Sequence, residues 1–344
     1  MNNIFEARKK INGKSQVPVW FMRQAGRYHS HYQNIKKTSD FMTMCKNPEL
    51  ACEVTMGPIQ DFKFNAAILF SDLLFPLEHL GMGLTYEPGP KLSWHLEKTD
   101  DLKKLKPVKP AQDFFKFQAE ACRLLVNKLP QDVTLLGFVG APFTLYTYAV
   151  EGSHAGNLVS SRKGFYDGRF QGFCETLFPE LIEEMVLQVA GGADAVALFD
   201  TAAGELSPFD YERFVVPEIR KITAAFKAKC PFAKIIYYSK HTNFKFIDAV
   251  ADKNIDVIGV DWRLDLKEVL NRYSKDYYIQ GNIDPIWLHL PWEHLENNLK
   301  TFWKNLEGTN HAKWICGLGH GVTIETPEMN VKKTVEFVHQ NFLY

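Results

Sequence analysis

The sequence predicts an α/β protein in which one (β/α)8 barrel, a TIM barrel, occupies residues 1–344 as a single domain. Three observations lead to this fold class. Short apolar or β-branched runs alternate with longer amphipathic stretches along the chain. A polar or glycine-rich cluster follows each apolar run. No linker rich in Gly, Ser or Pro divides the 344 residues, a length that accommodates such a barrel.

Parallel strands are expected from the apolar runs, because continuous apolar sequence is typical of strands buried on both faces. In chain order these runs are Val17–Met22, Ala66–Phe70, Val133–Val139, Ala193–Phe199, Lys234–Tyr238, Asp256–Val260, Tyr277–Gln280 and Lys313–Gly317. An additional hairpin is expected at Leu84–His95, where turn-forming residues gather at Glu87, Pro88, Gly89 and Pro90.

Helices are expected from the amphipathic stretches, which show apolar residues at helical spacing. They are Glu49–Phe62, Asp113–Leu129, Phe178–Ala190, Tyr211–Lys229, Lys245–Asp252, Glu293–Asn305 and, after the last strand, Glu328–Phe342. This alternation of strands and helices predicts a parallel sheet rather than an antiparallel one.

The clusters that follow the strands predict where a site lies. In a (β/α)8 barrel the carboxyl ends of all strands meet on one face, and active sites are built there. The clusters are Arg23 to Arg27, Ser71 with Asp72, Gly140 to Pro142, Asp200 with Thr201, Ser239 with Lys240, Asp261 to Arg263, Asn282 with Asp284, and Gly319 to Gly321. Any one of them could be a helix cap or a turn, but the whole series is better explained by an active site at the C-terminal face.

Composition narrows the class of protein. The formal net charge is zero, so no overall field attracts nucleic acid or an anionic membrane, and attraction for anions must be local. The six cysteines are scattered without a CxxC pair or metal-ligand spacing, which is typical of reduced thiols in a cytoplasmic protein. No apolar stretch approaches membrane-spanning length. We therefore expect a cytoplasmic protein without a nucleic-acid or membrane partner.

The most informative segment is PVWFMRQAGRY, residues 18–28, where a buried apolar run ends abruptly in Arg23, Gln24, Ala25, Gly26 and Arg27. Two guanidiniums separated by small residues can bind carboxylates or phosphates, each in a bidentate manner. A surface turn with two solvated arginines is the alternative. The other strand-end clusters favour the anion clamp.

Asp72 is the second candidate. It follows the run ILFS and precedes three apolar residues, so its carboxylate is expected in poorly screened surroundings, where it interacts strongly with a cation or with N–H groups. Helix capping is the alternative role, for which Ser71 competes.

Tyr148, Thr201 and His320 are weaker candidates. Tyr148 is either a core residue or a hydroxyl directed into the barrel mouth, and Thr201 is either a cap or a hydroxyl donor. His320 lies between two glycines, which permit close backbone approach and free placement of the ring.

The remaining histidines, among them His29, His31, His241 and His311, show no ligand spacing and are interpreted as surface or packing groups. Lys240 could form a Schiff base with a carbonyl substrate. A structural lysine paired with a carboxylate such as Asp261 is the more favoured interpretation.

Together these residues resemble the uroporphyrinogen decarboxylase family of haem biosynthesis. The resemblance runs from about Pro18 to Asn330 and is carried by PVWFMRQAGRY, AAILFSDLLFP, GFVGAPFTLYTYAVEG, LFDTAAGELSP, IGVDWR, IQGNIDP and GLGHG. It implies a (β/α)8 barrel, usually a homodimer, that uses no metal or organic cofactor. It also implies that the chain converts uroporphyrinogen III, a small-molecule tetrapyrrole, to coproporphyrinogen III by releasing four carboxyl groups as CO2.

The resemblance also implies roles for individual residues. Arg23 and Arg27 would bind substrate carboxylates, and Gln24, Ala25 and Gly26 would shape that wall of the pocket. Asp72 would accept hydrogen bonds from the pyrrole N–H groups and stabilise positive charge on the ring. Tyr148, Thr201 and His320 would contact the substrate side chains. Arg23 or Arg27 would relay the proton, although a water could do so instead, because arginine is a poor acid.

The chain departs from the family pattern at several positions. His29 and Ser30 stand where the family usually has Leu-Pro, Gly317 stands for an asparagine, and Ile324 stands for a proline. His241 and Ala202 replace a more usual glycine and tryptophan. These departures concern loop shape and none replaces a candidate site residue.

Three other functions are open to the sequence. Corrinoid-dependent methyltransferases share the barrel but need a His-x-Cys zinc motif, and no His-x-Cys occurs in this chain. A Schiff-base lyase would use Lys240. A tetrapyrrole carrier without catalysis would keep Arg23 and Arg27 and tolerate changes at Asp72.

Overall fold

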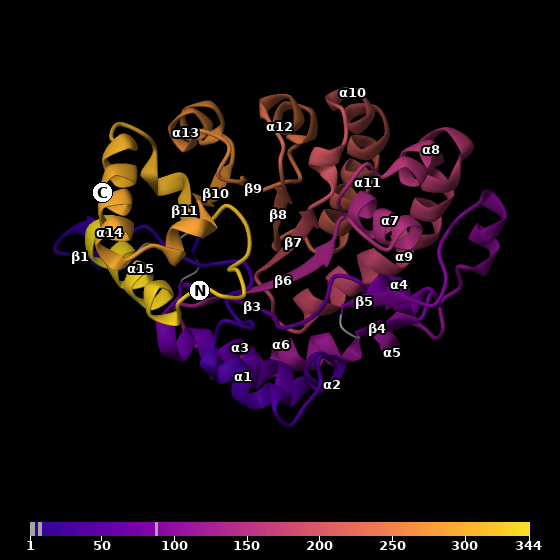
Figure 1. The fold of residues 1–344 in the computed structure, drawn as a ribbon, viewed down its shortest axis with the longest axis horizontal. Helices are drawn as coiled ribbons and strands as arrows, with labels where there is room; N and C mark the ends of the chain where they lie inside the picture. The colour runs from indigo at the N-terminus through magenta and orange to yellow at the C-terminus, as the bar shows by residue number, and fades with distance from the viewer. Residues whose placement is uncertain (1–3, 6–8, 87–88) are drawn as a thin grey trace.

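A parallel sheet forms the centre of the computed structural model, which describes residues 4–5, 9–86 and 89–344. The strands occupy the middle of the ribbon and the helices surround them (Figure 1). Seven strands are hydrogen-bonded in the order β11-β10-β9-β8-β7-β6-β3. Their bounds are β3 (Ala66–Ile68), β6 (Thr134–Gly140), β7 (Ala195–Asp200), β8 (Lys234–Ser239), β9 (Val257–Gly259), β10 (Tyr278–Ile283) and β11 (Trp314–Leu318). These strands lie where the second to eighth apolar runs predicted them.

The first predicted strand, Val17–Met22, is not a regular strand. It makes one isolated parallel bridge, between Val19 and Cys316 of β11. On its other side it contacts Asn65: the Asn65 amide donates to the Val19 carbonyl at 2.9 Å, and the Asn65 side chain accepts from the Val19 amide at 2.8 Å. A ladder cannot continue there, because Asn65 precedes β3 and uses its side chain for one of the two bonds. The segment thus lies between the two edges of the curled sheet, and the expectation of eight regular strands was wrong at this position.

The helices follow the amphipathic pattern, with several that the sequence did not reveal. They are α1 (Ser30–Lys36), α2 (Phe41–Lys46), α3 (Pro48–Phe62), α4 (Phe75–His79), α5 (Ala111–Phe114), α6 (Lys116–Lys128), α7 (Pro142–Glu151), α8 (Val159–Asp167), α9 (Arg169–Ala190), α10 (Pro208–Asp210), α11 (Val216–Lys229), α12 (Phe244–Val250), α13 (Leu266–Tyr273), α14 (Trp292–Asn305) and α15 (Glu328–Asn341). Shorter 3-10 turns lie at Thr99–Lys104, Ala203–Glu205, Pro285–His289 and His311–Lys313.

Two predicted helices are interrupted. The stretch Asp113–Leu129 is divided at Phe115, which has a ψ of 6° and separates α5 from α6. The stretch Tyr211–Lys229 opens with a π-helical turn at Tyr211–Val215 before α11 begins. Pro217 explains the second interruption, because it has no N–H to donate to the preceding turn.

Two antiparallel hairpins flank the parallel sheet. The predicted hairpin is confirmed as β4 (Leu84–Tyr86) and β5 (Pro90–Leu92), with Leu84 opposite Leu92. Its expected turn residues Glu87 and Pro88 lie outside the described residues. A second, unpredicted hairpin joins β1 (Lys10–Ile11) to β2 (Lys14–Ser15) through Asn12 and Gly13, which both have the positive φ that a tight Asn-Gly turn requires.

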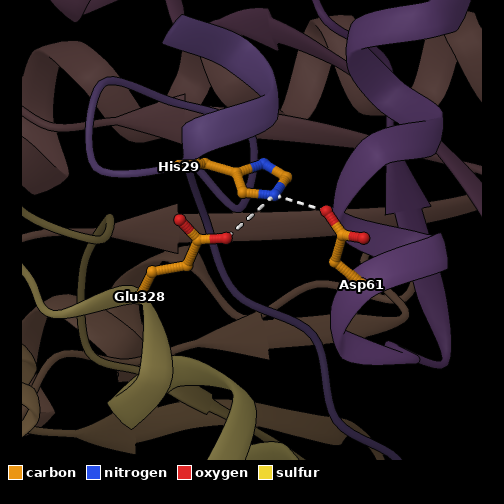
Figure 2. A group of neighbouring side chains, drawn as sticks. All are labelled: His29, Asp61 and Glu328. Atoms are coloured by element: carbon orange, nitrogen blue, oxygen red, sulfur yellow. Dashed lines mark hydrogen bonds and ion pairs between the residues drawn. The ribbon is translucent and has the colours of Figure 1, made fainter. Parts of the chain in front are cut away.

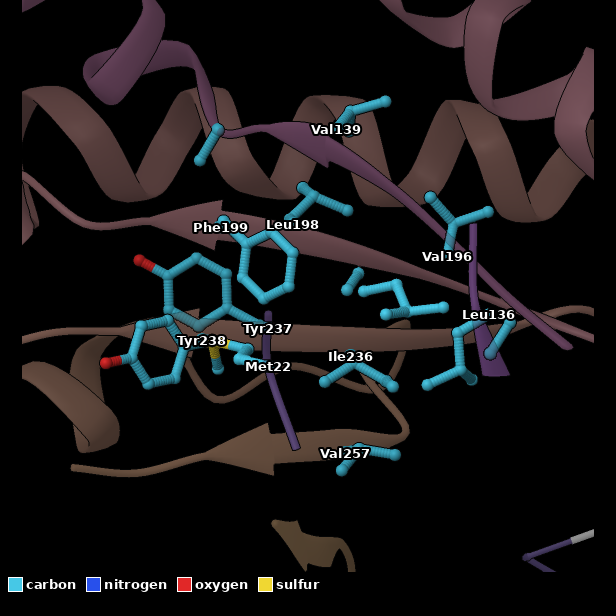
Figure 3. Packing of buried hydrophobic residues seen from close by; sticks show 14 of the residues in the cluster. Met22, Leu136, Val139, Val196, Leu198, Phe199, Ile236, Tyr237, Tyr238 and Val257 are labelled. Carbon is cyan, nitrogen blue, oxygen red and sulfur yellow. The ribbon is translucent and has the colours of Figure 1, made fainter. Parts of the chain in front are cut away.

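Most of the core is one apolar cluster that extends from Ile4 to Phe342, and a small second cluster contains Tyr32, Met44 and Val54. Neighbouring strands contribute side chains in register: Ile236 of β8 lies opposite Val257 of β9, and both are buried (Figure 3). Every residue of β7 is buried, as expected for a parallel strand covered on both faces. Among the described residues, no helix has the length and apolar character needed to cross a membrane.

Candidate active site

The charge of Arg23 acts on several titratable groups near the strand ends. Burial raises the pKa of the Asp72 carboxyl and of the Tyr148 hydroxyl, and the positive charge of Arg23 partly offsets that rise; burial lowers the pKa of His320, and the charge of Arg23 lowers it further. These three groups come from separate segments of the chain, and the field of one guanidinium reaches all of them. In the described part of the chain no carboxylate lies within 4 Å of the Arg23 nitrogens. The guanidinium is therefore available to a negatively charged ligand.

The backbone at Arg23 and the loop after β11 are joined. Arg23 has a φ of 57°, the left-handed conformation, so the chain turns sharply where the apolar run ends. The Val322 amide donates to the Met22 carbonyl at 3.0 Å. A Cβ on Gly321 would lie 2.5 Å from Arg23 Cδ, so the side chain of Arg23 passes directly over this glycine.

The other clamp residues differ in exposure. Gln24 is fully buried, and neither polar atom of its side chain has a partner within the described residues. Ala25 and Gly26 are half-buried, and Ala25 packs against a small cluster that includes Tyr32. Arg27 is exposed, and its carbonyl accepts a hydrogen bond from the Gln33 side chain. The two arginines therefore face solvent while the residues between them support the turn.

His29 anchors the clamp to two helices and is not a surface group. Its side chain is fully buried, with Nε2 2.8 Å from Asp61 Oδ2 of α3 and 3.7 Å from Glu328 Oε1 of α15 (Figure 2). The Ser30 amide also donates to Glu328, at 2.9 Å. His29 and Ser30, the departures from Leu-Pro, thus tie the clamp to both helices.

These three side chains are close enough to hold a metal ion. However, a metal-bound histidine normally donates its second ring N–H to an acceptor. The buried Nδ1 of His29 has no partner among the described residues. The arrangement therefore suits a neutral ring that donates from Nε2 to Asp61, with Nδ1 unprotonated.

Asp72 lies in the loop between β3 and α4. One carboxylate oxygen accepts from the Leu74 amide at 2.8 Å, which forms a local turn and does not cap the helix. Burial raises the pKa of the carboxyl, and a hydrogen bond from the Tyr86 hydroxyl, the Leu74 amide and the charge of Arg23 partly offset that rise. Tyr86 of β4 is a site residue that sequence reasoning missed, because a hairpin prediction does not say which strand end it approaches.

Tyr148 is half-buried on α7, and its hydroxyl is 2.6 Å from Nδ1 of His154. Burial and the Asp72 charge raise the pKa of Tyr148 to about 12, so the phenol stays protonated near neutral pH. Burial together with the positive charges of Lys240 and Arg23 lowers the pKa of His154. Tyr148 also lines a cavity of about 310 Å³ whose wall is formed by Leu74, Pro90, Lys91, Leu92, His95 and Gly152.

Thr201 lies in the turn directly after β7 and is half-buried. Its neighbour Asp200 is fully buried and accepts hydrogen bonds from Thr144 at 3.0 Å and from Tyr237 at 2.8 Å. Burial raises the pKa of Asp200 to about 6. Asp200 therefore holds the carboxyl end of β7 through hydrogen bonds in the core. Thr201 is the next residue and lies in the turn outside the core.

His320 packs against Tyr238 of β8, with the two rings parallel within 7° and their centroids 6.0 Å apart. The Tyr238 hydroxyl donates to the Gly319 carbonyl at 2.7 Å and lies 3.2 Å from His320 Nδ1. Burial and the positive charges of Arg23 and Lys240 lower the pKa of His320 to about 3. The imidazole is therefore neutral at physiological pH.

The close approach expected of the flanking glycines is confirmed. A Cβ on Gly319 would lie 2.5 Å from the backbone nitrogen of Trp262, and Gly321 is covered by Arg23. Gly317 gives room to Gln280, whose Nε2 would lie 2.3 Å from an added Cβ.

Lys240 follows β8 and is half-buried. It makes no ion pair with Asp261, which instead accepts from the His241 amide at 2.6 Å and from Arg263 Nη1 at 3.1 Å. Burial and the positive charges of Arg263 and Arg23 lower the pKa of Lys240. The favoured pairing of Lys240 with Asp261 is therefore wrong. Lys240 instead contributes positive charge to the same region as Arg23.

Comparisons with known proteins show the family of the chain. The family model described as uroporphyrinogen decarboxylase (URO-D) matches residues 7–341. The uroporphyrinogen decarboxylase of Thermodesulfovibrio yellowstonii is 40% identical over 330 residues, which cover 94% of each chain. That of Carboxydothermus hydrogenoformans is 34% identical over 344 residues, 99% of this chain and 97% of the relative. Among solved structures, a methyltransferase from Methanosarcina mazei has a TM-score of 0.75 at 17% identity over 97% of this chain and 96% of its own, which shows a shared fold. The match to the family model over nearly the whole length, with these two relatives, establishes that the chain belongs to the uroporphyrinogen decarboxylase family.

Proposed function

We propose that the protein decarboxylates uroporphyrinogen III to coproporphyrinogen III, releasing four CO2, in haem and porphyrin biosynthesis. The observation that carries the proposal is the placement of Asp72 within the field of Arg23 at the carboxyl ends of the strands. A cyclic tetrapyrrole with eight carboxylates around N–H groups needs both a central acceptor and cationic surroundings. This pair supplies one of each on a chain whose net charge is zero.

The pyrrole ring is the electron sink for the reaction. A proton adds to the ring carbon next to the one that bears the acetate, which places positive charge on the acetate-bearing carbon. The bond to the carboxylate then breaks, its electron pair neutralises the ring, and CO2 leaves. Protonation of the resulting exocyclic methylene gives the methyl group, and loss of the proton that was first added to the ring restores the aromatic pyrrole. No separate cofactor is needed to accept the electrons, because the substrate accepts them itself.

Asp72 accepts hydrogen bonds from the pyrrole N–H groups and stabilises the cationic ring, which makes it the catalytic residue of the proposal. Arg23 binds a substrate carboxylate and orders the proton donor. Arg27 binds a second carboxylate, and the turn of Gln24, Ala25 and Gly26 shapes the wall between the two guanidiniums.

Three further residues contact the substrate side chains in this proposal: Tyr148, Thr201 and His320. A neutral His320 can donate a hydrogen bond to a carboxylate without adding charge. The Tyr148 hydroxyl and its partner His154 offer a second polar contact near Asp72. Thr201 contributes a hydroxyl at the end of β7.

We further propose that Val17–Met22 occupies the eighth strand position and closes the curled sheet, so that residues 1–344 form one (β/α)8 domain. The support is that this segment bonds to β11 through Cys316 and to Asn65 before β3. The proposed working form is a cytoplasmic homodimer that has neither nucleic acid nor membrane as a partner. Six unpaired cysteines support the reducing compartment.

The test is anaerobic incubation of purified, metal-stripped protein with uroporphyrinogen III, followed by chromatography of the oxidised porphyrins. The expected result is a progression through intermediates with seven, six and five carboxyl groups to coproporphyrin. Substrate that binds without turnover would identify a tetrapyrrole carrier and overturn the proposal. Trapping of a substrate carbonyl on Lys240 by borohydride would instead identify Schiff-base chemistry. Sedimentation as a monomer at micromolar concentration would remove the homodimer.

A further inference from the structure

A buried network of hydrogen-bonded polar side chains lies behind the loop that carries Asp72, and the proposed reaction does not use it. Glu184 and Gln188, one turn apart on α9, meet Gln118 of α6, and all three are at most 1% exposed. Gln118 Nε2 donates to Glu184 Oε1 at 2.8 Å and to Ser71 Oγ at 3.1 Å. Ser71 is the residue directly before Asp72, so the network connects a helix on the outside of the sheet to the candidate catalytic loop.

The direction of every hydrogen bond in this network follows from the bond to the Phe138 carbonyl. The Phe138 carbonyl of β6 can only accept, so the group that contacts it at 3.0 Å is the Gln188 amide nitrogen. That nitrogen also donates to Gln118 Oε1 at 2.9 Å. Gln118 therefore points its own nitrogen away from Gln188, toward Glu184 and Ser71. Both of those oxygens must act as acceptors, and the Ser71 hydroxyl keeps its proton for another partner.

The absence of a side chain at Gly137 of β6 leaves space for Gln188 of the network. A Cβ on this residue would lie 2.1 Å from Gln188 Oε1 and 3.2 Å from Gln188 Cβ. No side chain fits between the strand and the helix at this point. Gln188 is thus held against the strand, and this fixes the orientation of the amide groups that follow it.

Glu184 has no cationic partner. Within residues 4–5, 9–86 and 89–344, no lysine, arginine or histidine nitrogen lies within 4 Å of its carboxyl group, and Oε2 has no partner at all. Burial of a carboxylate with one neutral donor is costly, so the neutral acid is the stable form. Burial raises the pKa of Glu184 to about 8, and the negative charge of Asp72 contributes to that rise.

The other titratable groups near this face of α9 are engaged elsewhere or uncharged. One turn before Glu184, the Glu180 carboxylate is bonded to His79 of α4 at 2.6 Å. The next acidic residue on α4, Glu78, pairs with Lys46 at 2.6 Å. On α6, burial raises the pKa of the Cys122 thiol to about 12, which keeps it neutral.

We propose that Glu184 is a positioning residue for the decarboxylation: through Gln118 it holds the Ser71 hydroxyl and thereby fixes the loop that presents Asp72. This role rests on the function proposed above. When Glu184 ionises, it repels Asp72 and attracts the Gln118 amide away from Ser71. Turnover should therefore fall as the pH rises and Glu184 ionises. A neutral amide at position 184 cannot ionise, so a variant that carries one should not show this fall.

The experiment compares the pH dependence of kcat and KM for uroporphyrinogen III in three variants of the full chain. Glu184→Gln keeps an acceptor oxygen and cannot ionise, so kcat should stay within about twofold of wild type at pH 7 and its alkaline decline should disappear. Glu184→Leu removes the acceptor, so kcat should fall about tenfold at every pH with little change in KM, as expected for a misplaced catalytic group. Glu183→Gln makes the same chemical change one residue away, where the carboxylate contacts Gln112 and Lys229, and should behave as wild type.

The proposal is overturned if Glu184→Leu keeps the wild-type kcat and pH profile, or if Glu184→Gln retains the alkaline decline. Ser71→Ala provides an independent test with little change in volume, in case the leucine variant does not fold. It should lower kcat several-fold without raising KM, and wild-type kcat in this variant would also overturn the proposal. Absence of turnover in the wild-type protein would instead refute the decarboxylase function, so the two failures are distinguishable.

Discussion

The side chain of Arg23 lies directly across the backbone of Gly321, so that a Cβ on the glycine would come within 2.5 Å of Cδ and 2.7 Å of Cγ. Real Cβ atoms do not make such contacts, and the missing side chain at position 321 therefore sets the path of the guanidinium. The hydrogen bond between Met22 and Val322 holds the two backbones together at this crossing. The position of the principal cation of the site thus depends on two loops from opposite ends of the chain.

Gly321→Ala should displace the Arg23 side chain. Because a charge-assisted contact with the substrate would be lost or lengthened, we expect KM for uroporphyrinogen to rise about tenfold with a smaller change in kcat. Steady-state kinetics measure both constants. Gly89→Ala is the matched control, since an added Cβ there meets no atom within 4 Å. An unchanged KM in Gly321→Ala would contradict the dependence of Arg23 on this glycine.

Asp72→Asn should fold normally and lose most turnover. The amide cannot stabilise a cationic ring, and loss of one preorganised electrostatic partner typically lowers kcat by about 10²–10³. Circular dichroism and single-turnover assays separate folding from chemistry. Asp40→Asn serves as the control, because Asp40 caps α2 and asparagine caps helices equally well. Wild-type turnover in Asp72→Asn would refute the role of Asp72.

Arg27→Ala should mainly weaken substrate binding. Its guanidinium is exposed, so removal leaves no unpaired buried group, and we expect about a tenfold rise in KM with kcat nearly unchanged. Arg27→Lys should give an intermediate KM, because an ammonium keeps the charge but not the bidentate geometry. Titration with the product coproporphyrinogen measures binding separately. Equal affinity in all three proteins would exclude a carboxylate clamp at Arg27.

His320 should make stability depend on pH in the acid range. In the unfolded chain a histidine titrates near pH ~6.5, whereas burial lowers the pKa of His320 in the folded protein to about 3. As the pH falls through this window the unfolded chain binds a proton that the folded chain does not, so stability declines. His320→Gln should make the decline of Tm with falling pH shallower, with His339 still contributing to it. Replacement of exposed His294 by Gln should leave the slope unchanged, and an unaltered slope in His320→Gln would contradict a buried neutral ring.

The regular part of the fold could be predicted because its signal is local. Buried strands such as β7 are continuously apolar, and helices such as α14 alternate apolar and polar faces, so a short window of sequence is sufficient. The segment Val17–Met22 carries the same apolar signal. Its pairing depends on Asn65, whose side chain replaces a backbone group, and no local pattern encodes that replacement.

Most residues of the candidate site were predictable because they lie shortly after strands. Asp72 lies in the loop after β3 and His320 in the loop after β11, and a barrel brings such positions together whatever the intervening sequence. Tyr86 reaches Asp72 from a hairpin, and Glu184 reaches Ser71 through Gln118 from the faces of two helices. The helical pattern identifies these faces as buried. It does not say which polar side chains on them will meet.

The bridge between Val19 and Cys316 limits when during synthesis the proposed site can form. Arg23 follows the first of these segments and Gly321 follows the second, so the position of the guanidinium is not fixed until the ribosome has added Gly321 and Val322. A contact of such long sequence separation also closes late in folding, because the intervening chain must first be ordered. Chains that end before Gly321 would therefore carry Asp72 without a fixed Arg23 side chain, and turnover of the tetrapyrrole would begin only after this loop has been added.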